Sequence, residues 1–255
     1  MGFIVIIPAR YGSTRLPAKP LSDIGGKPLI QYVHERAHEA GADEVIIATD
    51  DVRIRDAAQA FGAQVCMTDT AHTSGTDRIA EVARLRGYSD DAIVVNLQGD
   101  EPLMPPTLLR QVATNLANHP PAAIATLCEA ITDPAHLFEP SIVKVVMDRE
   151  GYALYFSRAT VPWDRDHFAS GARTLPPRTR YYRHMGMYAY RAGFLRSYAG
   201  LPPCPLEQSE SLEQLRALWY GHRIHVAEAL ERGEAGVDTP ADLERIRAVL
   251  ARGRR

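Results

Sequence analysis

Cysteine is scarce in this chain, and its distribution excludes two common classes of small protein. Cys66, Cys128 and Cys204 stand far apart and are odd in number. No C-x-x-C or paired Cys/His spacing indicates a zinc site, and a disulfide framework does not fit. We therefore expect a protein of a reducing compartment, without a structural metal or disulfides.

Long hydrophobic runs are also missing. The apolar run from Phe3 to Ile7 ends at Pro8, which is too short for the hydrophobic region of a signal peptide. No segment approaches the roughly 20 apolar residues that a membrane-spanning helix needs. These absences predict a cytoplasmic protein with no membrane partner.

An excess of charge of one sign is the third absence. Lys and Arg total 29 and Asp and Glu total 31, so the formal net charge is -2. Such a balance does not favour a nucleic-acid or membrane surface. The 255 residues are 45% hydrophobic and 24% charged, as is typical of a globular protein, and are enough for one large domain.

Two frequent nucleotide-binding motifs are absent as well. The chain contains no G-x-x-x-x-G-K-[ST], which argues against a P-loop ATPase. The loop after the first apolar run lacks G-x-G-x-x-G, which argues against a dinucleotide-dependent dehydrogenase.

Apolar runs typical of strands alternate with amphipathic stretches through the first half of the chain. This alternation predicts an α/β fold, a mostly parallel sheet with right-handed crossovers and helices on both faces. We expect strands at residues 3–7, 45–49, 64–67, 92–97 and 122–128, and helices at 28–40, 52–61, 74–86 and from about 106.

The second half has a different character, and we expect it to form a smaller mixed lobe. Two apolar runs around Asp148-Arg149-Glu150-Gly151 predict a hairpin. Residues 162–183 are rich in Pro, Arg and Tyr and predict an irregular segment. Further predictions are a strand at 184–190, a helix at 207–220, and a helix that Thr239 caps, with Pro240 first and Asp242 completing a capping box.

The loop after the first strand is the most informative segment. It carries Arg10, Arg15 and Lys19 on a framework of glycine, serine and proline. A buried parallel strand should open this loop at the carboxyl edge of the sheet, where open α/β sheets bind their ligands. Three cations, free backbone N–H groups and the close approach that Gly12 allows suit a polyphosphate.

Two acidic residues that are far apart in the chain each stand at the end of an expected strand or helix. Asp100 follows a predicted buried strand, and Asp238 stands immediately before a capped helix. Carboxylates in both places could hold one Mg²⁺, which takes hard oxygen ligands. An Asp beside a helix start is more often a cap, so the residues alone leave both interpretations open.

Seven sequence segments stand out in order along the chain: P-A-R-Y-G-S-T-R-L-P-x-K-P (8–20), H-T-S-G-T-D-R (72–78), N-L-Q-G-D-E-P (96–102), Y-F-S-R-A-x-V-P (155–162), H-M-G-M-Y-A-Y (184–190), L-E-Q-S-E-S-L-E-Q-L-R (206–216) and G-V-D-T-P-x-D-L (236–243). Together they resemble the cytidylyltransferases that activate 3-deoxy-D-manno-octulosonate (Kdo). The resemblance implies a nucleotide-diphospho-sugar transferase fold. It also implies transfer of CMP from CTP to Kdo, with release of pyrophosphate, for lipopolysaccharide biosynthesis.

The resemblance also implies roles for individual residues. Arg10 and Lys19 would lie nearest the charge that develops during transfer, and Asp100 and Asp238 would ligate Mg²⁺. The implied nucleotide contacts are Pro8, Ala9, Arg10, Gly12, Ser13, Arg15, Lys19, Ser74, Arg78 and Gln98. The implied contacts to the sugar acid are Arg158, His184, Tyr188, Glu210 and Gln214.

The resemblance further implies one nucleotidyltransferase domain over residues 1–255. Residues 1–130 would mainly bind nucleotide, and 131–235 would form the sugar-acid pocket and, through the hairpin near 142–157, a homodimer. The contacts of 164–178 are the least determined, because that stretch matches least well. Two alternatives stay open: a sialic-acid cytidylyltransferase, and a non-catalytic nucleotide-binding protein on the same fold.

Overall fold

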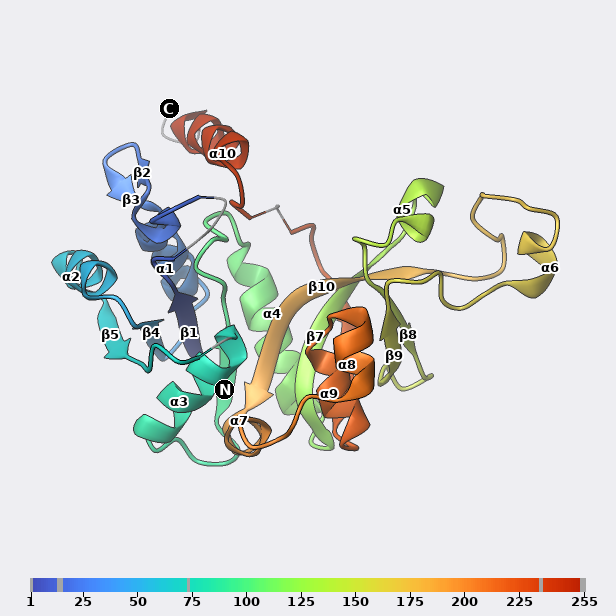
Figure 1. The fold of residues 1–255 in the computed structure, drawn as a ribbon, viewed down its shortest axis with the longest axis horizontal. Helices are drawn as coiled ribbons and strands as arrows, with labels where there is room; N and C mark the ends of the chain where they lie inside the picture. The colour runs from blue at the N-terminus through green and yellow to red at the C-terminus, as the bar shows by residue number, and fades with distance from the viewer. Residues whose placement is uncertain (1, 13–15, 73, 234–235, 253–255) are drawn as a thin grey trace.

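The computed structural model describes residues 2–12, 16–72, 74–233 and 236–252. A mixed sheet forms its centre (Figure 1), and the strand order is β11-β7-β10-β6-β1-β4-β5. The strands of this path are β1 (Ile4–Ala9), β4 (Glu44–Thr49), β5 (Gln64–Met67), β6 (Ile93–Asn96), β7 (Ala122–Ala130), β10 (Tyr182–Arg191) and β11 (Arg223–Glu228).

The sheet is mostly parallel, as predicted. Strand β1 pairs in parallel with β4 and β6, and β4 pairs in parallel with β5. The exception is β10, which runs antiparallel between β6 and β7, while β7 and β11 pair in parallel. Its position brings the second half of the chain into the sheet, so the two halves share one core. Strand β11 was not predicted.

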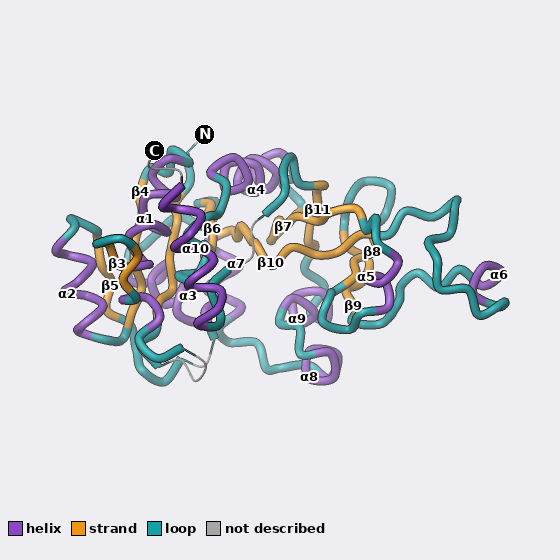
Figure 2. The backbone as a smooth tube through the Cα atoms, turned by 90° about the horizontal axis from the view of Figure 1, so that it is seen from above, coloured by secondary structure: helices purple, strands orange, loops and turns teal. Residues whose placement is uncertain are grey.

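Helices cover both faces of the sheet because each strand directs alternate side chains to opposite faces. Val5 and Ile7 of β1 pack into one core with α1, α4 and α10, whereas Ile6 packs into the other with α3, α7 and α9. Figure 2 shows these layers from above. The helices are α1 (Leu29–Glu39), α2 (Val52–Ala60), α3 (Gly75–Leu85), α4 (Pro106–Asn118), α7 (Ala192–Tyr198), α8 (Pro205–Glu210), α9 (Gln214–Trp219) and α10 (Pro240–Arg252).

The predicted single helix over residues 207–220 is wrong. The chain forms α8 and α9 instead, separated at Ser211, whose φ of 52° is left-handed. Glu207 and Arg216 form a buried ion pair with an Oε1–Nη2 distance of 2.5 Å, one from each helix. The pair fixes the two short helices against each other, so the segment turns where helical periodicity predicts continuation.

The smaller lobe projects from the far end of the sheet, at the right of Figure 1. It contains the predicted hairpin, because β8 pairs antiparallel with β9. Residues 162–181 are irregular apart from one helical turn, as expected. The elements of this lobe are α5 (Pro134–Phe138), β8 (Lys144–Met147), β9 (Ala153–Ser157) and α6 (Arg165–Phe168).

Two short elements complete the described chain. The 3₁₀ helix η1 (Lys19–Leu21) follows the basic loop, and β2 (Asp23–Ile24) pairs with β3 (Lys27–Pro28). Within the described ranges, no helix combines the length and apolar character that a membrane crossing requires.

Candidate active site

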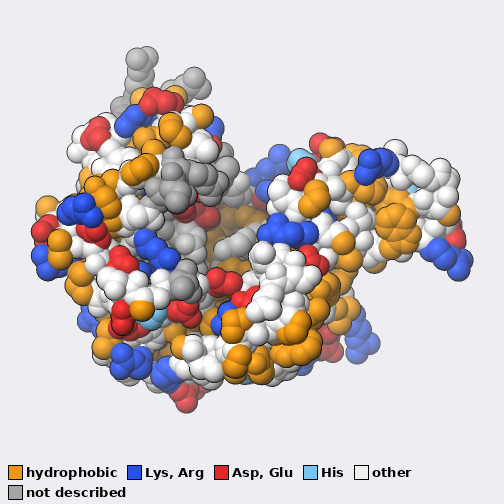
Figure 3. All heavy atoms as spheres, viewed as in Figure 1, with side chains coloured by type: hydrophobic (Ala, Val, Ile, Leu, Met, Phe, Trp, Pro, Cys, Tyr) orange, Lys and Arg blue, Asp and Glu red, His pale blue; other side chains and the backbone are white. Residues whose placement is uncertain are grey.

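A cleft of about 490 Å³ lies at the carboxyl edge of β1 and β6, where the parallel strands predict it. We call it the basic cleft. Figure 3 shows the surface hollowed between the body of the protein and the projecting lobe. Among the predicted nucleotide and metal residues, those that line the cleft are Pro8, Ala9, Arg10, Gly12, Lys19, Ser74, Gln98, Asp100 and Asp238.

The structure brings the two predicted metal ligands together around Lys19. The Lys19 Nζ lies 2.5 Å from Asp100 Oδ2 and 3.2 Å from Asp238 Oδ1. The two carboxylate oxygens therefore lie no farther apart than the sum of these distances. Asp100 and Asp238, which are 138 positions apart in the chain, thus both contact the Lys19 ammonium group.

Local sequence explains how each carboxylate reaches this point. Asp100 follows Gly99, at which a Cβ atom would lie 2.8 Å from the Pro8 carbonyl oxygen. Only glycine allows the two loops to approach so closely. Asp238 precedes α10, whose capping box forms as predicted: Thr239 N and Oγ1 donate to Asp242 Oδ2 at 3.0 and 2.8 Å. Because Asp242 caps the helix, the side chain of Asp238 can turn to Lys19.

The upper limit on the separation of the two carboxylates is compatible with a magnesium ion in place of the Lys19 ammonium group. Octahedral Mg²⁺ with bonds of about 2.1 Å holds two oxygens roughly 3–4 Å apart, a separation within the limit that Lys19 sets. No group of three or more His, Cys, Asp or Glu side chains suited to a metal occurs among the described residues. A cation here would therefore need oxygens from a ligand or water, as Mg²⁺ bound to a phosphorylated substrate does.

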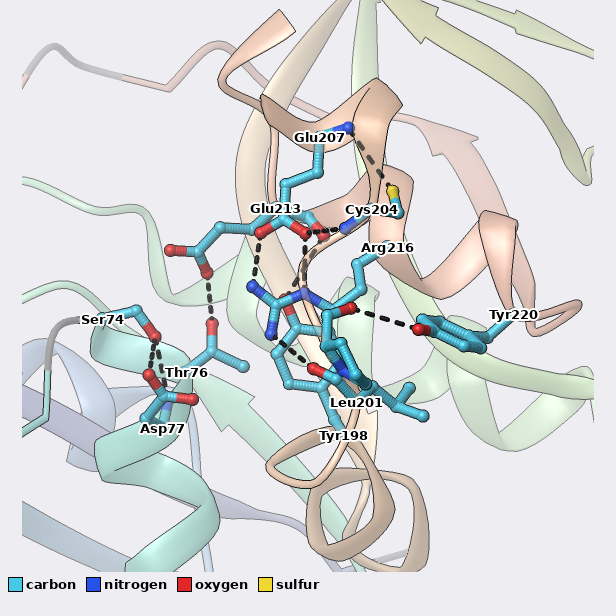
Figure 4. Close-up of polar contacts among 11 residues, drawn as sticks. Ser74, Thr76, Asp77, Tyr198, Leu201, Cys204, Glu207, Glu213, Arg216 and Tyr220 are labelled. Carbon is cyan, nitrogen blue, oxygen red and sulfur yellow. Dashed lines mark hydrogen bonds and ion pairs between the residues drawn. The ribbon is translucent and has the colours of Figure 1, made fainter. Parts of the chain in front are cut away.

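Two further features prepare the basic cleft for an anion. Arg10 Nη2 is buried and has no hydrogen-bond partner among the described residues. An unpaired buried guanidinium nitrogen is costly unless a ligand satisfies it. The N-terminus of α3 also opens on the cleft at Ser74 and Gly75, where Ser74 Oγ caps the helix by accepting from Asp77 N at 3.1 Å (Figure 4).

One predicted nucleotide residue that the structure describes, Arg78, is not found in the lining. Ser13 and Arg15 lie outside the described residues. Arg78 is fully buried, and its Nη2 lies 2.6 Å from Asp50 Oδ2 while Nη1 contacts Thr68. Arg78 does not line the basic cleft, because these partners hold its guanidinium inside the protein, and its nucleotide contact stays a prediction.

A second cavity of about 250 Å³ adjoins the basic cleft. We call it the tyrosine pocket. It shares Gly75, Gln98 and Glu213 with the basic cleft, so the two spaces meet. Its remaining lining is Thr76, Asn96, Ile124, Tyr188, Tyr190, Phe194, Tyr198, Ser211, Leu212 and Gln214.

Two of the predicted sugar-acid residues line the tyrosine pocket. They are Tyr188, from β10, and Gln214, from the start of α9. Gln214 Nε2 is buried and has no partner in the described part of the chain. Gln214 thus lines the pocket and carries a buried amide donor that no described residue satisfies.

The other three are held just outside the pocket lining. Glu210 accepts hydrogen bonds from Ser157 Oγ at 2.6 Å and from Arg158 N at 2.9 Å. His184 Nε2 lies 2.9 Å from Thr126 Oγ1, and burial lowers the pKa of His184 to about 3. A histidine with this pKa is neutral near pH 7, so it cannot supply positive charge to a carboxylate.

Glu213 is the main residue that sequence reasoning missed. It lines both cavities, and its Oε2 accepts a hydrogen bond from Thr76 Oγ1 at 3.0 Å (Figure 4). Burial raises the pKa of Glu213. The three-residue spacing of Glu207, Glu210 and Glu213 is typical of a solvated helix face. Because the chain breaks at Ser211, the three glutamates do not share one helix face. The only sequence feature that pointed to Glu213 as a site residue was its position beside Gln214 in a segment that resembles the family.

Fold and site together define the class. An α/β sheet whose carboxyl edge carries a cationic loop, two converging carboxylates and two joined cavities is suited to join a nucleotide to a second molecule. The family model described as "Cytidylyltransferase" matches residues 4–224. Solved nucleotidyltransferases at low identity share the fold, such as one from Methanothermobacter thermautotroptrophicus, with a TM-score of 0.62 and 16% identity.

Closer relatives narrow the family. A 3-deoxy-manno-octulosonate cytidylyltransferase of Vibrio vulnificus (strain YJ016) is 59% identical over 251 residues, covering 98% of this chain and 99% of the relative. That of Idiomarina loihiensis is 56% identical over 253 residues, covering 99% and 100%. A solved CMP:2-keto-3-deoxy-manno-octonic acid synthetase, complexed with CTP, superposes with a TM-score of 0.88 at 46% identity, covering 99% and 100%. This chain belongs to the 3-deoxy-manno-octulosonate cytidylyltransferase family, which confirms the resemblance and the fold class.

Proposed function

We propose that this protein transfers CMP from CTP to the anomeric hydroxyl of Kdo, giving CMP-Kdo and pyrophosphate. The relatives at 56–59% identity carry the name of this activity, and the solved relative at 46% identity is described as a complex with CTP. The product would serve lipopolysaccharide biosynthesis, the role that the family resemblance implies.

The observation that carries the proposal is the junction of two unlike cavities. Arg10 lines the basic cleft and Gln214 lines the tyrosine pocket, and each carries a buried donor, Nη2 and Nε2, without a partner among the described residues. Each donor suits the oxygen of a different substrate. Because the cavities share Glu213 and Gln98, the two substrates would meet between them.

Charge sets the orientation of each substrate. The basic cleft carries Arg10 and Lys19, whereas no Lys or Arg is found among the described residues that line the tyrosine pocket. The triphosphate and the carboxylate of the sugar acid would therefore face Lys19. The uncharged hydroxyl groups of the sugar would lie in the tyrosine pocket, where hydroxyl and amide groups can pair with them.

The chain then contributes mainly position and charge. In phosphoryl-type transfer the protein does little covalent work, so aligning the hydroxyl with the α-phosphorus supplies much of the rate. Arg10 and Lys19 would neutralise charge as pyrophosphate departs. Asp100 and Asp238 would hold Mg²⁺, which when bound lowers the pKa of a coordinated hydroxyl and neutralises phosphate charge.

The remaining predictions belong to this proposal. Residues 1–130 would mainly bind nucleotide, and 131–235 would form the sugar-acid site. The hairpin of β8 and β9 would contribute to a homodimer in the cytoplasm. Arg158, His184 and Glu210 would act from the edge of the tyrosine pocket: His184 contacts the lining residue Tyr188, Glu210 directly precedes Ser211, and Arg158 reaches the lining through Glu210.

Pyrophosphate release from CTP tests the function. The purified protein is given CTP and Mg²⁺ with Kdo, with N-acetylneuraminate, or with no sugar acid. We expect turnover with Kdo, none without a sugar acid, and loss of turnover when EDTA removes the metal. Turnover with N-acetylneuraminate alone would identify a sialic-acid cytidylyltransferase. Binding of CTP without turnover under every condition would identify a nucleotide-binding protein.

A further inference from the structure

Lys144, on β8, is a fully buried lysine with an unusual set of partners. Its Nζ donates to three backbone carbonyl oxygens: Ile142 and Arg158, both at 2.6 Å, and Glu139 at 3.0 Å. The described residues place no carboxylate within ion-pair distance of this nitrogen. All three N–H bonds of the ammonium group are therefore used by main-chain acceptors.

A buried ammonium group of this kind lowers the stability of the folded protein, so we expect it where the protein needs the backbone geometry that the group imposes. Burying an ammonium group without an opposite charge in contact carries a desolvation cost of several kcal/mol, which hydrogen bonds only partly offset. A hydrophobic side chain would fill the same space at lower cost. The three bonds fix three separate points of the backbone, and these points identify what Lys144 organises.

The first group that Lys144 organises is Arg158. The Arg158 carbonyl accepts from Lys144 directly, which fixes the backbone that carries the guanidinium. The guanidinium Nη1 donates to the Pro140 carbonyl at 3.1 Å. Pro140 lies between Glu139 and Ile142, the other two residues whose carbonyls Lys144 binds. Lys144 thus holds both the origin of the Arg158 side chain and the turn that receives it.

The second group is the segment that lines the tyrosine pocket. Arg158 Nε donates to the Glu210 carbonyl at 2.6 Å, and Arg158 N donates to Glu210 Oε2 at 2.9 Å. Glu210 ends α8, directly before Ser211, which begins the pocket-lining stretch that ends at Gln214. A continuous set of hydrogen bonds therefore connects Lys144 with the pocket, although Lys144 itself touches neither cavity.

We propose that Lys144 is a positioning residue of the sugar-acid site, acting through Arg158 on the stretch 211–214. This inference rests on the proposed function. It predicts that loss of the ammonium group weakens sugar-acid binding more than nucleotide binding, because the whole stretch 211–214 lines the tyrosine pocket whereas only Glu213 of that stretch also lines the basic cleft. A lysine that only stabilised the core would not separate the two substrates.

The test compares Lys144→Met with Lys27→Met. Methionine replaces the lysine side chain as far as Cε and removes the ammonium group with its three N–H donors. Lys27 pairs with Glu35 at 2.7 Å on the surface and lines neither cavity, so it controls for loss of a lysine. For Lys144→Met we expect the KM for Kdo to rise about tenfold or more, with the KM for CTP changed by less than about twofold. Lys27→Met should leave both constants unchanged.

A double-mutant cycle tests whether the effect passes through Arg158. In an Arg158→Met background, Lys144→Met should add no further rise in the KM for Kdo, because the group it positions is gone. Fully additive effects, an unchanged KM for Kdo, or equal changes for both substrates would overturn the inference. If Lys144→Met does not fold, Lys144→Gln, which retains two N–H donors, is measured instead. If neither folds, Lys144 is a structural residue and the inference is wrong.

The same measurements separate this inference from the function on which it rests. A wild-type protein without turnover on Kdo contradicts the proposed function. A wild-type protein active on Kdo, with Lys144→Met kinetically normal, contradicts only the role of Lys144.

Discussion

Replacing Asp100 with asparagine removes one charge from the candidate metal site and preserves its shape. Asp100 Oδ2 lies 2.5 Å from Lys19 Nζ, and the Lys19 side chain is 13% exposed while that of Asp100 is 32% exposed. An asparagine oxygen can still accept a hydrogen bond from Lys19. The change therefore tests the carboxylate as a metal ligand rather than as a packing group.

Two free-energy changes follow from this geometry, one in protein stability and one in catalysis. A partly exposed charge-assisted hydrogen bond that becomes a neutral one should cost about 1 kcal/mol of unfolding free energy. Loss of one of two anionic metal ligands should instead cost several kcal/mol of transition-state stabilisation, on the order of 10³-fold in rate. The variant should thus remain folded and nearly inactive.

The assay follows pyrophosphate release over a range of Mg²⁺ concentrations, beside urea unfolding of the same samples. Asp166→Asn is the matched control, because Asp166 is an exposed carboxylate that, among the described residues, pairs only with Arg165. We expect a much lower kcat and a shift of the Mg²⁺ dependence to higher concentration for Asp100→Asn alone. A variant within about tenfold of the wild-type rate, at the wild-type Mg²⁺ dependence, would refute the metal assignment.

Three further predictions concern the other parts of the site. Arg10→Met should raise the KM for CTP about tenfold or more by removing a guanidinium whose buried Nη2 has no partner among the described residues, whereas a larger effect on Kdo would contradict its placement. Gln214→Leu should raise the KM for Kdo and leave that for CTP unchanged; equal effects on both would show that Gln214 does not contact the sugar acid. His225 has its pKa lowered by burial to about 4, below its unfolded value near 6.5. The unfolded chain therefore binds more protons there, so the wild type should lose about 2 kcal/mol relative to His225→Gln between pH 7 and pH 5. Urea unfolding at both pH values measures this difference, and a constant difference would contradict it.

Local signals explain most of what sequence reasoning predicted correctly. Strands β1, β4 and β6 are short apolar runs bounded by turn residues, and both of their faces are buried, as such runs predict. The capping box of Thr239 and Asp242 and the cap of Ser74 depend on residues three apart. Interactions over so few residues are encoded directly in the order of side chains.

The errors arose where distant contacts override local preference. Helical periodicity favours one helix over residues 207–220, but Ser211 adopts a left-handed conformation because Glu207 pairs with Arg216 across the break. The family resemblance implied a nucleotide contact for Arg78, but no local pattern indicates that Asp50 pairs with its guanidinium inside the protein. In neither case does a pattern in the sequence specify the partner.

By itself the amino-acid sequence determined the alternating α/β order, the cationic loop at the end of the first strand and the candidate ligands Asp100 and Asp238. The tertiary structure alone decided that these carboxylates meet at Lys19, that β10 enters the sheet antiparallel, and that Glu213 lies between two cavities. The physical reason is the separation along the chain of the residues that interact. Turns, caps and strand runs depend on neighbours in the chain, whereas a site built from residues 19, 100, 213 and 238 exists only after the whole core has packed.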